Sequence, residues 1–110
     1  MEKQDFEDYR KFFNENGYVL FKNAVDHKTL EIMNSEVSAW IEDSRSHNKN
    51  FGVTIDSRPR FDLELNTHSK DNPALRRIAS PIEISETFLS FTRDNLALDL
   101  ITQIFSPNVK

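Results

Sequence analysis

The stretch VTIDSRPRFDLEL (residues 53–65) decides the fold class, because apolar and polar side chains alternate along it. An alternation with period two is the pattern of a β-strand, here with one apolar face and one charged face. Pro59 has no backbone N–H to donate, so it interrupts the hydrogen-bonded ladder of any sheet that contains it. The stretch therefore predicts either one edge strand or two strands with a break at Arg58-Pro59.

The residues that precede this stretch have helical spacing instead. Aromatic side chains recur at helical intervals through residues 5–16, and Gly17 follows where a left-handed helix cap belongs. A short apolar run at 18–21 predicts a strand. Asp26 can cap a second helix over about 27–45, with apolar positions at Leu30, Met33, Val37, Trp40 and Ile41.

The residues that follow the stretch predict further helices. Asn72-Pro73 supplies a cap and a first-turn proline for a short helix through Ala79, and Ser80-Pro81 repeats this signal. Helical segments are expected over about 82–92 and 94–104, and residues 106–110 read as a turn that enters a strand. No linker or repeat divides the chain, so we expect an α+β fold over residues 1–110 without an internal domain boundary.

Composition excludes several classes of function. The 110 residues include 14 basic and 18 acidic side chains, for a net charge of −4, so we expect no nucleic-acid partner and no membrane partner. There is no cysteine, which removes disulfides and zinc-thiolate sites, and no apolar N-terminal segment resembles a signal peptide. A cytoplasmic protein is expected. Its apolar fraction of 37% predicts a thin core.

The histidines do not predict a metal site. Two positions after His27, His47 and His68 stand Thr29, Lys49 and Lys70, so no His-x-Asp or His-x-Glu pair occurs. The two-His-one-carboxylate iron site therefore cannot be assembled from this chain. We interpret His27 as a first-turn helix residue and the other two as loop residues, and we predict no catalytic residue and no metal ligand.

The charged face of residues 56–64 is the one candidate binding site. It carries Arg58 and Arg60 together with three carboxylates. Guanidinium groups in this arrangement can hold a carboxylate or phosphate through two parallel hydrogen bonds. The alternative interpretation is a salt-bridged face of an edge strand, exposed to solvent.

Two segments resemble the phytanoyl-CoA dioxygenase family. The first is FFNENGYVLFKNAV (residues 12–25), an aromatic helix end followed by glycine, a hydrophobic run and a long helix. The second is FTRDNLALDLITQIFSPNVK (residues 91–110), which is similar to the segment that leads into the catalytic barrel of those enzymes.

This resemblance implies a double-stranded β-helix (jelly-roll, cupin-like) oxygenase that uses Fe(II) and 2-oxoglutarate. The chain is then the N-terminal helical and edge-strand portion of that fold, with the C-terminal barrel as its missing covalent partner. The iron ligands of the family lie in the barrel, so neither cofactor is expected to bind this chain alone, which is expected to be inactive. Arg60, and less closely Arg58, match the position of a basic residue that approaches the cosubstrate.

Two functions thus stay open from the sequence. The first is the N-terminal part of a dioxygenase acting on a small-molecule substrate. The second is a stand-alone α+β interaction module without catalysis, whose aromatic helix faces bind a partner protein. We also expect the isolated chain to be marginally stable or to self-associate.

Overall fold

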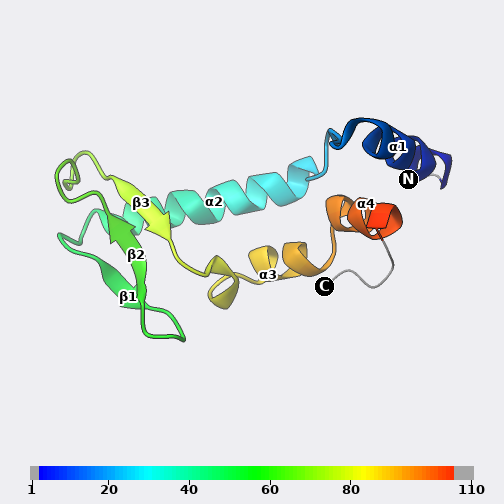
Figure 1. Cartoon of the computed structure of the whole chain (residues 1–110). Helices are drawn as coiled ribbons and strands as arrows, with labels where there is room; N and C mark the ends of the chain where they lie inside the picture. The colour runs from blue at the N-terminus through cyan, green and yellow to red at the C-terminus, as the bar shows by residue number, and fades with distance from the viewer. Residues whose placement is uncertain (1–2, 106–110) are drawn as a thin grey trace. The chain divides into compact units, whose positions relative to one another are not determined.

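The computed structural model describes residues 3–105, in the order α1, α2, β1, β2, β3, a 3-10 turn, α3 and α4 (Figure 1). These residues form two compact units. One unit holds residues 3–26 and 91–105, and the other holds His27–Ser90. The turn and strand predicted for 106–110 lie outside the described residues. Within the described part, no helix is both long and apolar enough to cross a membrane.

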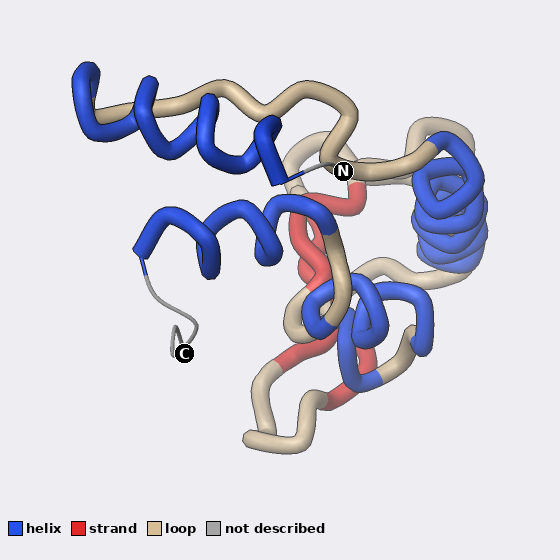
Figure 2. Tube along the Cα trace, turned by 90° about the vertical axis from the view of Figure 1, so that its right-hand side faces the viewer, coloured by secondary structure: helices blue, strands red, loops and turns tan. Residues whose placement is uncertain are grey.

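In the first unit, α1 (Lys3–Asn16) lies beside α4 (Leu96–Phe105), as Figures 1 and 2 show. The Arg10 guanidinium of α1 donates to the Gln103 carbonyl of α4, with Nε at 3.1 Å. Asn95 caps α4, because its Oδ1 accepts from Leu98 N at 2.7 Å. The helix predicted over 94–104 is confirmed.

The end of α1 is also confirmed. Gly17 has φ +78°, and its N–H donates to the Phe13 carbonyl at 2.7 Å. The strand predicted for 18–21 is wrong, since no residue of this segment pairs with a strand in the described part of the chain. Two aromatic contacts fold the segment back onto α1 instead, Phe12 with Tyr18 at 5.4 Å and Tyr9 with Phe21 at 5.2 Å between ring centroids.

The second unit is built around α2 (His27–Ser44), which confirms the helix predicted over 27–45. Trp40 of α2 contacts Phe61 at 6.2 Å and Phe88 at 5.9 Å between ring centroids. Trp40 therefore forms one side of a small aromatic cluster, which joins α2 to the sheet and to α3.

The sheet has three antiparallel strands in the order β1 (Phe51–Val53), β2 (Pro59–Leu63) and β3 (Leu75–Ile78). The interruption before Pro59 is as the two-strand alternative for residues 53–65 predicts, but the first strand, β1, starts at Phe51 and already ends at Val53. The edge-strand alternative is wrong, because β2 is the central strand. Pro59 is tolerated there as the first residue of β2, where it faces Val53.

The short helix predicted from Asn72-Pro73 through Ala79 is wrong, because this part of the chain forms β3. Its residues pair with β2, Ile78 with Phe61 and Leu75 with Leu63. Local capping signals favour a helix, but pairing with a strand more than ten residues away offers hydrogen bonds that a short helix lacks. The helix predicted over 82–92 forms in two pieces, the 3-10 turn Pro81–Glu83 and α3 (Glu86–Arg93).

Ser85 separates these two pieces and begins α3. Its Oγ accepts from Phe88 N at 3.1 Å and donates to Glu36 Oε2 of α2 at 2.7 Å. The hydroxyl therefore caps α3 and ties it to α2 at the same time.

The core is thin. Among the described residues, the buried apolar side chains are Leu63 in the second unit and Leu100 in the first. The fold class is α+β, with helices and a small antiparallel sheet.

Candidate functional site

The loop between β1 and β2 is built on Thr54 and Asp56. The Thr54 hydroxyl donates to Asp56 Oδ1 at 2.5 Å and accepts from Arg58 N at 2.9 Å, while Thr54 N donates to the Arg58 carbonyl at 2.8 Å. Ser57 takes a left-handed conformation, with φ +67°, to close the loop. The two ends of the loop are thereby held together by one buried threonine.

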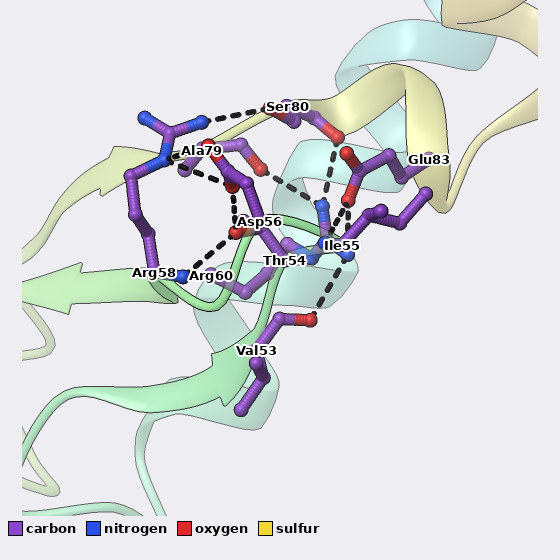
Figure 3. A network of polar contacts seen from close by, with 9 residues as sticks. All are labelled: Val53, Thr54, Ile55, Asp56, Arg58, Arg60, Ala79, Ser80 and Glu83. Carbon is purple, nitrogen blue, oxygen red and sulfur yellow. Dashed lines mark hydrogen bonds and ion pairs between the residues drawn. The ribbon is translucent and has the colours of Figure 1, made fainter.

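Arg58 lies on the outside of this loop. Its Nε donates to Asp56 Oδ2 at 2.8 Å, and its Nη2 lies 3.3 Å from Ser80 Oγ (Figure 3). The Arg58 side chain is 58% exposed and that of Asp56 is 62% exposed. A cation in this position is accessible to an anion from solvent.

Arg60 is in the opposite situation. Its side chain is 7% exposed and pairs with Glu83 Oε1 at 2.8 Å, and that same oxygen accepts from Ile55 N at 3.0 Å. Nη1 donates to the carbonyls of Ala79 (3.1 Å) and Ser80 (2.9 Å), and Nη2 donates to the carbonyl of Val53 (3.2 Å), as Figure 3 shows. One guanidinium thus connects the end of β1, the end of β3 and the 3-10 turn.

Asp62, two residues after Arg60 in β2, also forms an ion pair. It is buried, and its Oδ2 accepts from Arg77 Nε of β3 at 2.6 Å and also binds Arg77 Nη2. The three acid–base pairs of this region therefore join Asp56 to Arg58, Glu83 to Arg60, and Asp62 to Arg77.

The charged face predicted for residues 56–64 is thus salt-bridged, but two of its members are buried instead of solvated. The two arginines predicted to hold a carboxylate differ sharply in access. If it binds a ligand, Arg58 gives up an exposed ion pair with Asp56 and a hydrogen bond to Ser80, whereas Arg60 gives up a buried ion pair. Of the two, Arg58 is the residue whose geometry suits a soluble anion.

His68, interpreted above as a loop residue, also has a structural role that the sequence did not indicate. Its Nδ1 accepts from Ala74 N at 2.9 Å, and its Nε2 lies 3.1 Å from the Ser44 carbonyl and 2.9 Å from the His47 carbonyl. Because an acceptor at Nδ1 requires the proton at Nε2, the ring donates to the last carbonyl of α2, that of Ser44, and to the His47 carbonyl in the loop that follows. A histidine in a polar loop gives no local signal of such a partner.

No metal centre is formed by the described residues. Among residues 3–105, no three side chains of histidine, cysteine, aspartate or glutamate lie close enough together to hold an ion.

No protein-family model, no curated protein and no solved structure matches this chain. Function therefore has to follow from the residues themselves and from the sequence resemblance.

The hydrogen bonds to Asp56 lead to a prediction about its pKa. The hydrogen bond from the Thr54 hydroxyl, followed by that from Arg58, holds the pKa of Asp56 below its ordinary value. A carboxylate whose pKa is lowered by folding adds stability above its unfolded pKa of about 3.9, and this contribution is lost as the pH falls through the lower folded value. We expect Thr54→Val and Arg58→Gln each to raise the pKa of Asp56, because each removes a hydrogen bond to its carboxylate.

The measurement is the carboxyl carbon shift of Asp56 by NMR, followed from about pH 2 to pH 6. The parent and both variants are titrated at the same ionic strength, since salt screens the Arg58 contribution. A pKa that stays the same in Thr54→Val contradicts the assignment of the hydroxyl as the main cause.

Proposed function

We propose that this chain is the N-terminal part of an Fe(II)/2-oxoglutarate-dependent dioxygenase resembling phytanoyl-CoA dioxygenase. In this proposal it supplies supporting helices and part of the wall of a pocket for a small-molecule substrate. Further residues supply the jelly-roll barrel, with its iron ligands and most of its cosubstrate contacts.

The observation that carries the proposal is the segment after Gly17. This segment belongs to the motif on which the family resemblance rests, and its residues Tyr18 and Leu20 are 63% and 67% exposed. A segment that packs against a sheet in the complete domain exposes its apolar side chains when the described residues do not include that sheet.

Two further observations agree with an incomplete domain. The described residues bury only Leu63 and Leu100 among apolar side chains. The three-stranded sheet also has two edges, β1 and β3, to which further strands can add. Arg58 is the accessible arginine, so in the complete domain we assign it to the contact between this chain and the cosubstrate.

The test reads the gene beyond codon 110 and expresses its full product. We expect a His-x-Asp motif within the following residues, and Fe(II)-dependent conversion of 2-oxoglutarate to succinate by the longer protein. Residues 1–110 alone should form no succinate above a metal-only blank, because their sequence contains no His-x-Asp or His-x-Glu pair. Succinate formation by residues 1–110 would contradict the proposal that the catalytic residues lie in the part of the protein beyond residue 110.

The second candidate function is a stand-alone interaction module. It is favoured by Val53 and Ile55, which are 70% and 85% exposed although Thr54 and Arg60 hold the loop between β1 and β2 in place. Rigid, exposed apolar side chains are typical of a surface that binds another protein. A stop codon directly after codon 110, with no succinate formed, would favour this function over the dioxygenase.

A further inference from the structure

The junction between α1 and the following segment carries a reactive peptide bond. Asn16-Gly17 is the one Asn–Gly pair in the sequence. Glycine has no side chain to hinder approach of its own nitrogen to the preceding asparagine, so this pair favours cyclisation more than other asparagine pairs. Both residues are exposed to solvent, and nothing lies within 4 Å of where a Cβ at Gly17 would be.

We propose that Asn16 is a site of spontaneous deamidation and that the cap of α1 controls its rate. The Gly17 nitrogen attacks Cγ of Asn16, a new C–N bond forms, and the bond from Cγ to Nδ2 breaks. The amide leaves as ammonia, which carries away the proton of Gly17 N. Water then opens the resulting succinimide at either carbonyl, leaving an aspartyl or an isoaspartyl residue at position 16.

The folded structure restrains both reacting groups. Gly17 N donates to the Phe13 carbonyl at 2.7 Å, and Asn16 Nδ2 donates to the Phe12 carbonyl at 2.9 Å. The attack requires the last turn of α1 to open and break the first of these bonds. Helix ends open with little free energy, so the reaction is slowed but not prevented.

The product changes the first unit in two ways. A carboxylate at position 16 cannot donate to the Phe12 carbonyl, and it places negative charge at the C-terminal end of the α1 dipole. The isoaspartyl form also adds a methylene to the backbone between α1 and Tyr18. That shifts the register of the contact between Phe12 and Tyr18, and of the contact between Tyr9 and Phe21. Deamidation is therefore expected to release the 18–21 segment from α1.

The experiment follows the purified chain over time at mildly alkaline pH by peptide mapping with mass spectrometry. We expect the mass change of deamidation to appear first in the peptide that contains Asn16, and roughly ten-fold more slowly in buffer than in denaturant. That factor corresponds to an opening free energy of about 1.4 kcal/mol. The Asn16→Gln variant keeps a side-chain amide and should lose the modification.

Three outcomes overturn the proposal. Deamidation that appears first at another asparagine would contradict the assignment of Asn16 as the site. Equal deamidation rates in buffer and in denaturant would contradict control of the rate by the α1 cap. NMR contacts between Phe12 and Tyr18 that persist in the separated isoaspartyl product would contradict the release of the 18–21 segment from α1. None of these measurements depends on an enzymatic activity.

Discussion

Replacing Arg60 by alanine is expected to lower the free energy of unfolding by about 3–5 kcal/mol, the cost of leaving one partner of a buried ion pair alone. The Glu83 carboxylate, whose side chain is 19% exposed, would keep only Ile55 N as a donor. The carbonyls of Val53, Ala79 and Ser80 would lose a donor as well. Since small domains have total stabilities of about 5–15 kcal/mol, this single change can unfold much of the population.

The matched control is Arg58→Ala, two residues away and of the same chemistry. Its ion pair with Asp56 is exposed, so its removal should leave the unfolding midpoint close to that of the parent. Both are measured by urea denaturation followed by circular dichroism. The double variant Arg60→Met with Glu83→Gln removes both charges and should recover part of the loss. If Arg60→Ala unfolds at the same urea concentration as the parent, the buried network is not what holds the sheet to the 3-10 turn.

This pair of variants also bears on the proposed function. Because Arg60→Ala is expected to unfold the protein, it would lose 2-oxoglutarate binding for that reason alone. Such a loss would therefore not show that Arg60 contacts the ligand. Arg58→Ala keeps the fold and changes the accessible cation. In the longer protein, a raised KM for 2-oxoglutarate in Arg58→Ala with an unchanged unfolding midpoint would support its assignment to the cosubstrate.

The sequence predicted α1, α2 and α4 because their signals are local. Gly17 ends α1, and apolar spacing indicates α4, all within a few residues of the positions concerned. The strands were predicted only where alternation was long enough to detect. β3 was missed because Leu75–Ile78 is short and carries a proline-based helix signal just before it, while its partner β2 lies about a dozen residues earlier.

The candidate site shows the same division between local and distant information. Alternation correctly placed Arg60 and Asp62 on one face of a strand, and it favoured a solvated face because both are charged. Their burial depends on Glu83, on the backbone carbonyls of residues 79–80 and on Arg77, which fold over that face from later in the chain. No pattern within residues 53–65 can indicate these partners.

Gly52→Ala is the second change with a large expected effect, a loss of about 2–5 kcal/mol in the free energy of unfolding. Gly52 lies in β1 with φ +73°, a conformation that costs an L-residue about 1–2 kcal/mol. A Cβ at this position would also lie 2.8 Å from Cβ of Arg60 and 3.2 Å from Cδ2 of Phe61. Cβ of Arg60 is fixed to the backbone of the central strand, so relief requires β1 and β2 to separate, at a further cost of about 1–3 kcal/mol.

Gly17→Ala separates the two causes, because Gly17 has nearly the same backbone conformation, with φ +78°, but no atom within 4 Å of the added Cβ. It should lose only the conformational part, about 1–2 kcal/mol. The two variants are compared by urea denaturation, with the amide shifts of Arg60 and Phe61 as a local probe of the contact between β1 and β2. Equal losses in the two variants would show that the close approach of β1 to Arg60 adds nothing to the cost. A larger loss in Gly52→Ala, with shifted Arg60 and Phe61 amides, would locate the extra cost at the point where Arg60 enters its buried network.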